Sequence, residues 1–234
     1  MTAIVLAGGM GTRLKSVVQD VPKPMALIGN KPFLEYLFEY LNNNNVTDVI
    51  LSVGYNCGVI TDYFSSTFRG VSIRYVVENE PLGTGGAIKL ALNECSGENI
   101  FILNGDTFFD VDLHALMHYH ISNSADITIS MKEMHDISRY GTLKMNNGLI
   151  TSFIEKDNVA DGSYGYINGG VYCIRNELFI SFDLPCKFSF EKFLEDYVRK
   201  LKLFGFSSQG NFIDIGIPDD YSAAQGLLPK WVSV

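Results

Sequence analysis

A glycine-rich stretch near the start of the chain carries residues that could hold a phosphate group. Residues 7–14 read Ala-Gly-Gly-Met-Gly-Thr-Arg-Leu and follow directly on the apolar run 3–6, which is typical of a short buried strand. The three glycines lack a Cβ, so the backbone N–H groups of this turn can approach a ligand closely. Arg13 adds a guanidinium, which can bind two oxygen atoms of a phosphate at once. This combination favours a site for a polyphosphate.

Two known phosphate-binding patterns do not match this stretch. A Walker loop ends in Gly-Lys followed by Ser or Thr, whereas this chain has Gly11-Thr12-Arg13, which excludes that class. The dinucleotide fingerprint needs a third glycine where Leu14 stands and an acidic residue near 52–54, so an oxidoreductase is a distant alternative. The glycines alone would also fit a turn without a ligand. Arg13 and the later Pro22-Lys23-Pro24-Met25 favour a nucleotide site over that alternative.

Two aspartates lie in or directly after apolar runs that read as strands. Asp106 follows the run 99–103 within Asn104-Gly105-Asp106, and Asp214 lies in the run 211–216. In an open parallel sheet, ligands bind at the carboxyl ends of the strands. A carboxylate there can hold Mg²⁺ against a polyphosphate. For Asp106 alone, a helix-capping role is an equally good interpretation.

The composition bounds the class of protein. The chain has 234 residues, of which 47% are hydrophobic and 19% are charged, which is typical of a globular protein. Its net charge of −8 disfavours nucleic acid and anionic lipid as partners. We find no targeting segment and no apolar run long enough to span a membrane, so we expect a cytoplasmic protein.

The first half alternates strands and helices. Apolar runs at 49–53, 71–77 and 99–103 read as strands, and the segments 32–41 and 58–68 have helical spacing. This order predicts βαβ units, and therefore an α/β fold with a Rossmann-like, mostly parallel central sheet flanked by helices. Residues 82–87, Leu-Gly-Thr-Gly-Gly-Ala, begin a further helix. Their glycines would admit either a ligand or a neighbouring backbone.

The second half is richer in strands. The run 127–131 alternates, and 166–172 reads as a strand whose glycines would expose backbone to a ligand. Asn146-Asn147-Gly148, between 141–145 and 149–154, is typical of a hairpin turn. We expect these strands to form an additional β-rich lobe laid over the sheet as the second wall of a cleft. A helix is predicted over 189–201 and another from Pro218. The chain is interpreted as one domain, 1–234, with two halves of about 1–110 and 111–234.

Seven motifs in order identify a family resemblance. They are G-G-M-G-T-R-L, P-K-P, L-G-T-G-G-A, N-G-D, E-K, N-G-G-V-Y and F-I-D-I-G-I-P-D-D-Y. Together they resemble the sugar-1-phosphate nucleotidyltransferases, and most closely the short guanylyltransferases that act on D-glycero-α-D-manno-heptose 1-phosphate. The resemblance implies a GT-A-like nucleotide-diphospho-sugar transferase fold. It also implies transfer of a nucleotidyl group from a nucleoside triphosphate to a sugar 1-phosphate. Ile217 replaces a common threonine, which casts little doubt on the chemistry.

The resemblance also assigns roles to residues of this chain. The first half would bind the nucleotide and the second half the sugar phosphate. The residues implied in catalysis are Arg13, Lys23, Asp106, Lys156 and Asp214. Those implied in nucleotide binding are Leu6, Ala7, Gly8, Gly9, Gly11, Thr12, Arg13, Lys23, Glu78, Gly83, Thr84 and Asp106. Those implied in sugar-phosphate binding are Asn104, Gly141, Glu155, Lys156, Asn168 and Gly169. Asp106 and Asp214 would share one Mg²⁺ as the cofactor.

The expected donor is GTP, and the argument depends on Glu78. Relatives place a side chain at this point against the base edge, although a loop glutamate without a ligand is the plain alternative. Guanine offers two adjacent donors, N1–H and the N2 amino group, and one carboxylate can accept both. Thymine and uracil offer one donor between two carbonyl groups, which suits an amide better.

Several alternatives stay open. The best guess for the sugar is D-glycero-α-D-manno-heptose 1-phosphate, in surface polysaccharide synthesis, and the alternatives are mannose- or glucose-type acceptors with GTP, UTP or dTTP. A catalytically silent nucleotide-sugar sensor on the same fold is a different class. The presence of Asp106, Asp214, Arg13, Lys23 and Lys156 disfavours it. Whether the protein forms a homo-oligomer is left open.

Overall fold

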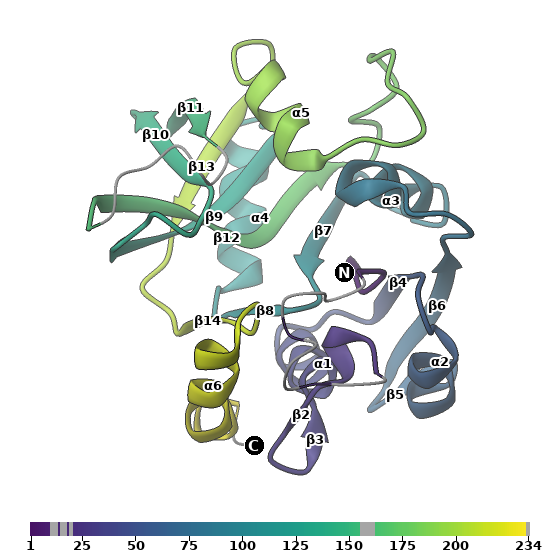
Figure 1. Cartoon of the computed structure of the whole chain (residues 1–234). Helices are drawn as coiled ribbons and strands as arrows, with labels where there is room; N and C mark the ends of the chain where they lie inside the picture. The colour runs from purple at the N-terminus through teal and green to yellow at the C-terminus, as the bar shows by residue number, and fades with distance from the viewer. Residues whose placement is uncertain (10–13, 15–17, 19–20, 155–161, 233–234) are drawn as a thin grey trace.

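The computed structural model describes residues 1–9, 14, 18, 21–154 and 162–232 (Figure 1). In chain order, the elements are β1 (Thr2–Leu6), the 3₁₀ helix η2 (Lys23–Met25), β2 (Leu27–Ile28), β3 (Lys31–Pro32), α1 (Phe33–Asn43), β4 (Asp48–Val53), α2 (Gly58–Phe64), β5 (Thr67–Phe68), β6 (Val71–Val77), α3 (Gly83–Leu92), β7 (Asn99–Asn104), β8 (Thr107–Phe109), α4 (Leu113–Ser122), β9 (Ile127–His135), β10 (Thr142–Asn146), β11 (Leu149–Ile154), β12 (Tyr164–Arg175), α5 (Phe190–Tyr197), β13 (Leu203–Ser207), β14 (Phe212–Asp214) and α6 (Pro218–Trp231).

Within the described residues, a ten-stranded sheet runs in the order β10-β11-β13-β9-β12-β7-β1-β4-β6-β5. In its N-terminal part, β1 pairs in parallel with both β4 and β7, and β4 pairs in parallel with β6. Strands β1, β4 and β7 are buried along almost their whole length because helices cover both faces of the sheet, whereas β6 alternates buried and exposed residues. The predicted α/β class and the parallel N-terminal sheet are confirmed.

The second half does not lie over this sheet, as the sequence led us to expect, but extends it. The C-terminal part of the 12-residue strand β12 pairs antiparallel with β7, from Val171 opposite Leu103 to Arg175 opposite Asn99. Strand β12 also pairs antiparallel with β9 and, in its N-terminal part, with β10, and β9 in turn pairs in parallel with β13. Figure 1 shows β12 beside β7 at the join. The long β12 thus supplies the hydrogen-bonding partner that β7 needs on its free edge.

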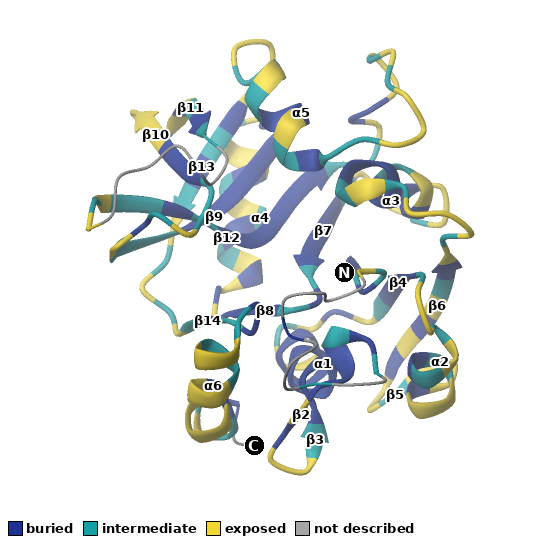
Figure 2. Ribbon diagram, viewed as in Figure 1, coloured by how far each residue is buried: buried dark blue, intermediate teal, exposed yellow. Residues whose placement is uncertain are grey.

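The central strands direct alternate side chains into two hydrophobic cores. In β1, Ala3 and Val5 belong to the core that contains side chains of α1, α2, α4 and α6. Ile4 belongs to the other core, which contains side chains of α3 and α5. The period of two in a strand produces this division. The sheet is therefore the buried middle layer of three, as Figure 2 shows by its dark blue strands.

The hairpin and several helix limits can be compared with expectation. Asn147 and Gly148 have φ of 50° and 81°, and they join β10 to β11 as the two-residue turn that the sequence predicts. The helix expected over 58–68 ends at Phe64, and the short strand β5 follows. The helix expected over 189–201 spans only Phe190–Tyr197. Within the described residues, no helix is both long and apolar enough to cross a bilayer.

Candidate active site

The carboxyl ends of the parallel strands bring the predicted site residues to one edge of the sheet. Leu6 at the end of β1 lies in register with Ser52 of β4 and with Asn104 of β7. Glu78 directly follows β6, and its N–H donates to the Val53 carbonyl at 2.7 Å. Two cavities open at this edge, one beside Leu6 and the other beside Asn104.

The first cavity has a volume of about 460 Å³. It contains most of the described residues that were predicted to bind the nucleotide. Its lining consists of Leu6, Gly8, Gly9, Gly54, Tyr55, Glu78, Asn79, Pro81, Gly83, Thr84 and Ala87. Ala7 is buried and does not line it, whereas Tyr55 lines it although no motif in the sequence indicated a role for this residue.

Glu78 is held in a fixed orientation within this cavity. Its Oε1 accepts a hydrogen bond from the buried Ser52 hydroxyl at 3.1 Å, and its Oε2 accepts one from the Leu82 N–H at 3.1 Å. Gly8 packs against it so closely that a Cβ there would lie 2.6 Å from Oε1. Each carboxylate oxygen keeps a second lone pair for a ligand, so the group can still accept two more hydrogen bonds.

The glycines of residues 82–87 contact a neighbouring backbone. The Gly85 and Gly86 N–H groups donate to the Phe188 carbonyl at 3.0 and 3.3 Å. A Cβ on Gly85 would lie 2.2 Å from the Phe188 ring, and one on Gly86 would lie 2.3 Å from the Cys186 carbonyl oxygen. Of the two interpretations left open by the sequence, close backbone approach therefore accounts for these two glycines.

A lysine and two aspartates meet beside the second cavity, which Asp214 lines. Lys23, at the start of η2, places its ammonium 2.6 Å from Asp106 Oδ2 and 3.6 Å from Asp214 Oδ1. Burial, and after it the negative charge of Asp106, raises the pKa of the Asp214 carboxyl, while Lys23 opposes this shift. The solvent-inaccessible Asp214 Oδ1 has no hydrogen-bond partner among the described residues. Two carboxylates that already share one cation, one of them with an unsatisfied oxygen, have the chemistry to hold Mg²⁺.

A short ladder brings Asp214 to Asp106 across 108 positions of sequence. Strand β14 pairs antiparallel with β8, which places Asp214 opposite Thr107. The Ile215 N–H donates to the Asp106 carbonyl at 3.0 Å, and the Thr107 hydroxyl to Asp106 Oδ1 at 3.3 Å. These contacts fix the separation of the two carboxylates.

The second cavity has a volume of about 250 Å³. It brings together the predicted sugar-site residues Asn104, Gly141 and Asn168 with Asp214. Gly170 lines it in place of Gly169, at which a Cβ would lie 2.4 Å from the Phe109 ring. Its full lining is Asn104, Thr107, Arg139, Tyr140, Gly141, Asn168, Gly170, Glu191, Phe212 and Asp214.

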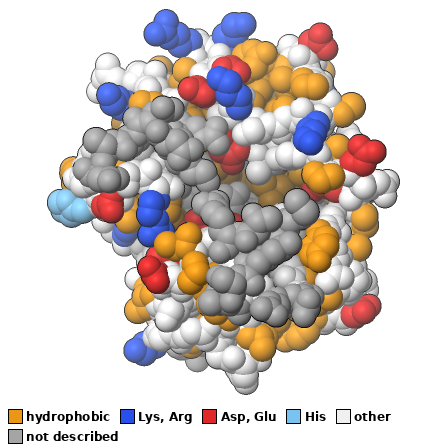
Figure 3. Space-filling model, in the orientation of Figure 1, with side chains coloured by type: hydrophobic (Ala, Val, Ile, Leu, Met, Phe, Trp, Pro, Cys, Tyr) orange, Lys and Arg blue, Asp and Glu red, His pale blue; other side chains and the backbone are white. Residues whose placement is uncertain are grey.

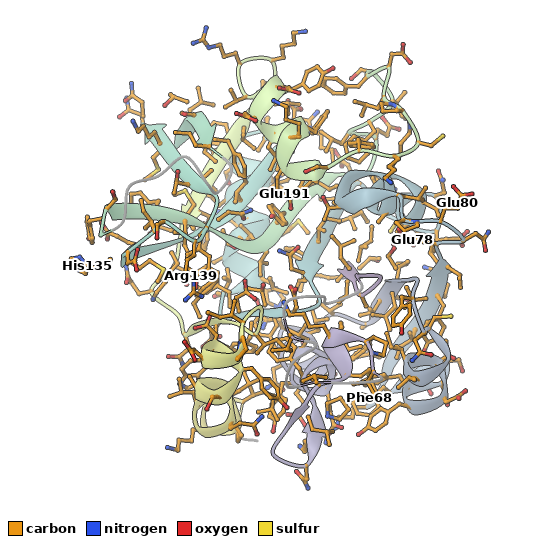
Figure 4. The ribbon with its side chains drawn as sticks, viewed as in Figure 1. Phe68, Glu78, Glu80, His135, Arg139 and Glu191 are labelled. Carbon is orange, nitrogen blue, oxygen red and sulfur yellow. The ribbon has the colours of Figure 1, made fainter. Side chains whose placement is uncertain are left out.

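Several lining residues of the second cavity gave no signal in the sequence. Arg139 forms an ion pair with Asp220 at the start of α6, and Figure 4 shows Arg139 in the β-rich half. Burial raises the pKa of Tyr140 to about 12, so its hydroxyl stays protonated at neutral pH. Glu191 lies in the first turn of α5. Arginine, tyrosine and glutamate are so common on surfaces that only the fold distinguishes these three.

Five of the predicted site residues lie outside the part of the chain that the structure describes. They are Gly11, Thr12, Arg13, Glu155 and Lys156. Their implied roles stay predictions.

On the face shown in Figure 3, basic side chains are interspersed with acidic and apolar ones.

Comparison with known proteins gives the family. A model of the nucleotidyl transferase family matches residues 2–230. The chain belongs to the nucleotidyl transferase family. This membership agrees with the resemblance that the seven motifs indicate.

Individual members of the nucleotidyl transferase family match over almost the whole chain. The D-glycero-alpha-D-manno-heptose 1-phosphate guanylyltransferase of Aneurinibacillus thermoaerophilus is 48% identical over 233 residues, covering 99% of this chain and 100% of the relative. The protein of the same name from Campylobacter jejuni is 48% identical over 222 residues, covering 94% and 97%. The crystal structure of HddC from Yersinia pseudotuberculosis complexed with GMP-PN has 37% identity and a TM-score of 0.83, covering 96% and 98%.

Proposed function

We propose that this protein transfers a guanylyl group from GTP to a sugar 1-phosphate, with D-glycero-α-D-manno-heptose 1-phosphate as the acceptor. The products are a GDP-sugar and pyrophosphate. The observation that carries the proposal is the cluster of Lys23, Asp106 and Asp214 at the edge of the sheet where both cavities open, with Asp214 in the lining of the second cavity. The names of the two 48% identical relatives and the GMP-PN complex of HddC support the choice of donor and acceptor.

The reaction needs positioning and charge neutralisation more than acid–base chemistry. An oxygen of the sugar phosphate attacks the α-phosphorus, a new P–O bond forms, and the bond to the β-phosphate oxygen breaks. The attacking oxygen of the sugar phosphate is already ionised at neutral pH, so no general base is required. In our proposal the nucleotide occupies the first cavity and the sugar the second. Lys23, which is paired with Asp106 and Asp214, would supply positive charge to the reacting phosphates.

Asp106 and Asp214 are the proposed ligands of Mg²⁺. When bound, Mg²⁺ neutralises phosphate charge and helps to orient the two substrates. The unsatisfied oxygen of Asp214 fits this role. Within our proposal, Lys23 stabilises the two carboxylates before the substrates arrive, because their mutual repulsion is otherwise unfavourable. Arg13 and Lys156 keep their proposed roles at the pyrophosphate and at the sugar phosphate.

Glu78 is the proposed reader of the base. Ser52 and the Leu82 N–H hold its carboxylate before any ligand binds. This pre-orientation supports recognition of N1–H and N2–H₂ of guanine, since less rotamer entropy is lost when the base binds. The same cavity would leave the second carboxylate oxygen facing a carbonyl group of uracil or thymine.

The cytoplasm is the proposed compartment because the donor is a nucleoside triphosphate. The GDP-sugar would serve the synthesis of a surface polysaccharide such as capsule or lipopolysaccharide. Mannose- or glucose-type acceptors are the alternatives for the second cavity. A silent sensor is disfavoured because Lys23, Asp106 and Asp214 are assembled at one point.

The experiment is a pyrophosphate-release assay over a grid of substrates. GTP, UTP, dTTP, CTP and ATP are each paired with heptose, mannose and glucose 1-phosphates in the presence of Mg²⁺. We expect the highest kcat/KM for GTP with the heptose 1-phosphate. A maximum at another pair would change the proposed substrates. Binding of GTP and the acceptor without pyrophosphate release at any pair would favour the sensor.

A further inference from the structure

We infer that Glu191 binds a hydroxyl group of the acceptor sugar and is a specificity-determining residue for it, held in place by Thr84 of the nucleotide cavity. The inference rests on the proposed function, because it assigns the sugar to the second cavity. Glu191 is absent from the motifs that identify the family, and its position in the fold is the reason to single it out.

One oxygen of the Glu191 carboxylate is fixed by two hydroxyl groups. Glu191 Oε2 accepts a hydrogen bond from the Thr84 hydroxyl at 2.7 Å and another from the Ser189 hydroxyl at 2.8 Å. Ser189 is also the N-cap of α5 and accepts a hydrogen bond from the Lys192 N–H. The rotamer of Glu191 is thus set by the same contacts that begin the helix. Figure 4 shows Glu191 at the end of α5 that faces the interior of the molecule.

The other oxygen of Glu191 is available to a ligand. Glu191 lines the cavity that also contains Asn104, Asn168 and Asp214. Its Oε1 receives no hydrogen bond from the part of the chain that the structure describes. A carboxylate oxygen has the geometry and charge to accept a strong hydrogen bond from a sugar hydroxyl. A pre-oriented acceptor of this kind at a cavity wall fixes which hydroxyl can stand there.

Electrostatics give the orientation of the acceptor in the cavity. The sugar phosphate is an anion, and Glu191 repels it. Lys23 is paired with Asp106 and Asp214 and does not line this cavity, whereas the cation Arg139 does. The phosphate is therefore directed away from Glu191, and the uncharged hydroxyl groups are the part of the acceptor that can lie beside it.

Thr84 links the two cavities through this carboxylate. Thr84 lines the nucleotide cavity, yet its hydroxyl donates to Glu191 and accepts a hydrogen bond from the Phe190 N–H at 2.8 Å. Its hydroxyl is committed to α5. We therefore assign Thr84 as a positioning residue for the acceptor, in addition to its place beside the nucleotide.

The test compares Glu191→Gln with Glu195→Gln. In the first variant an amide oxygen can still accept from Thr84 and Ser189, while a donor replaces the acceptor that faces the cavity. Glu195 lies one turn further along α5 and pairs with the exposed Lys192, so the second variant is a matched control. Binding of D-glycero-α-D-manno-heptose 1-phosphate is measured by calorimetry, and KM values are measured for both substrates.

We expect Glu191→Gln to weaken acceptor binding by about tenfold to a hundredfold and to change the KM for GTP by less than about twofold. Glu195→Gln should change neither value. Thr84→Val should weaken acceptor binding in the same direction, and Thr84→Ser should restore it because it keeps the hydroxyl. Unchanged acceptor binding in a folded Glu191→Gln protein would overturn the inference.

A second measurement uses a panel of acceptors that each lack one hydroxyl. One of these analogues should bind the unaltered protein about tenfold to a hundredfold more weakly than the complete acceptor does. Glu191→Gln should bind this analogue and the complete acceptor with equal affinity, because the hydrogen bond is already lost. If Glu191→Gln does not fold, the same comparison is made with Glu191→Asp. Strictly additive losses at every hydroxyl would overturn the assignment, and so would the absence of any sensitive hydroxyl. If the unaltered protein binds the acceptor without pyrophosphate release, the proposed function fails while this binding test still decides the role of Glu191. If it binds no sugar 1-phosphate, both fail.

Discussion

Lys23, Asp106 and Asp214 show how a charged site is assembled from residues that are far apart in sequence. The ammonium lies closer to Asp106 than to Asp214, and burial disfavours the charged form of Asp214. A carboxyl whose pKa is raised in the folded state lowers the free energy of unfolding once it is ionised. The folded protein therefore holds Asp214 at a cost in stability, which is common at functional sites.

The first prediction concerns these two aspartates. Asp106→Ala and Asp214→Ala should each lower kcat/KM by on the order of a thousandfold, because charge neutralisation at the phosphates is lost. Removal of Mg²⁺ by a chelator should have the same effect on the unaltered enzyme. Asp214→Asn should melt no lower than the unaltered protein at neutral pH, since it removes a carboxylate that is unfavourable when ionised. Asp219→Ala, at an exposed position in α6, is the control and should keep its activity. Full activity in either aspartate variant would contradict the shared-metal proposal.

The second prediction concerns Glu78. Glu78→Gln should reduce the preference for GTP over UTP and dTTP by about tenfold to a few hundredfold, because one charge-assisted hydrogen bond is replaced by a mismatched amide. The measurement is kcat/KM for each triphosphate. Glu80→Gln, at an exposed position two residues later, should leave selectivity unchanged (Figure 4). An unaltered selectivity in Glu78→Gln would assign the base to another residue.

At the scale of elements, the packing of α3 against the segment before α5 brings Thr84 of the first cavity to Glu191 of the second. The Phe188 N–H donates to the Leu82 carbonyl at 3.0 Å, and the first turn of α3 donates back to the Phe188 carbonyl. Gly86 permits this approach because a side chain would meet the Cys186 backbone. The geometry of Thr84 and Glu191 depends on this contact.

The third prediction tests this packing with two glycines in helices. Gly86→Ala in α3 should lower the free energy of unfolding by about 1–3 kcal/mol, since the clash is with a backbone carbonyl that cannot rotate away. Gly226→Ala in α6 should raise it by about 0.5–1 kcal/mol, because a Cβ there meets nothing within 4 Å and alanine favours the helix. Urea unfolding measures both changes, provided that the free energy of unfolding depends on urea concentration with the same slope in the variants and in the unaltered protein. A stabilised Gly86→Ala protein would show that the 186–188 segment moves aside easily.

The fourth prediction concerns a buried histidine between α4 and the sheet. His120 is hydrogen-bonded to the Thr128 hydroxyl at 2.9 Å and to Asn99 Oδ1 at 3.1 Å. Burial, followed by the charge of Arg175, lowers the pKa of His120 to about 4. Because the folded pKa lies below the unfolded one, this contribution to stability is complete above about pH 6.5 and is lost as the pH falls toward 4.

We therefore expect His120 to account for a loss of about 2 kcal/mol in the free energy of unfolding between pH 7 and pH 5. The measurement is urea unfolding across this range for the unaltered protein and for His120→Gln, which cannot titrate. The variant should be less stable at pH 7 and should show a flatter pH dependence. Parallel pH profiles for the two proteins would exclude His120 as the source.

The sequence predicted the long elements and the residues at the ends of parallel strands, because period, turn chemistry and strand ends are local properties. Asn147-Gly148 specifies its turn through two positive φ angles, so the hairpin could be predicted. The β8–β14 ladder could not, because strands of three residues have no measurable period. Glu191 was missed for another reason: its neighbours Thr84 and Asp214 are set by tertiary contacts alone.

At the scale of the whole molecule, the continuous sheet joins the two halves. The five paired positions between β12 and β7 connect the parallel N-terminal strands with the strands of the second half. Helices α4 and α6 come from the second half, yet their side chains complete the core around α1. Each half therefore covers apolar surface of the other half, and that surface would be exposed to solvent if either half stood alone.

The fifth prediction follows from this shared burial. The chain should unfold in urea as one cooperative unit, and a fragment of residues 1–110 should not fold cooperatively, because β7 would lack its partner. The fluorescence of the single tryptophan, Trp231, reports on α6 through its stacking on Phe108 of β8. Far-UV circular dichroism reports on all elements. Unfolding transitions that coincide in fluorescence and in circular dichroism would support one cooperative unit. Two separate transitions would show that the halves fold independently.

The pairing of β7 with β12 also has a consequence for synthesis on the ribosome. Strand β7 is apolar, and roughly 70 further residues must be translated after it before the end of β12 is complete. At about 5–20 residues per second, its edge stays without its final neighbour for roughly 4 to 14 s. An unpaired apolar edge can pair with another chain during that time. The nascent protein is thus most exposed to aggregation while its second half is being made, and chaperone binding should be concentrated in that interval.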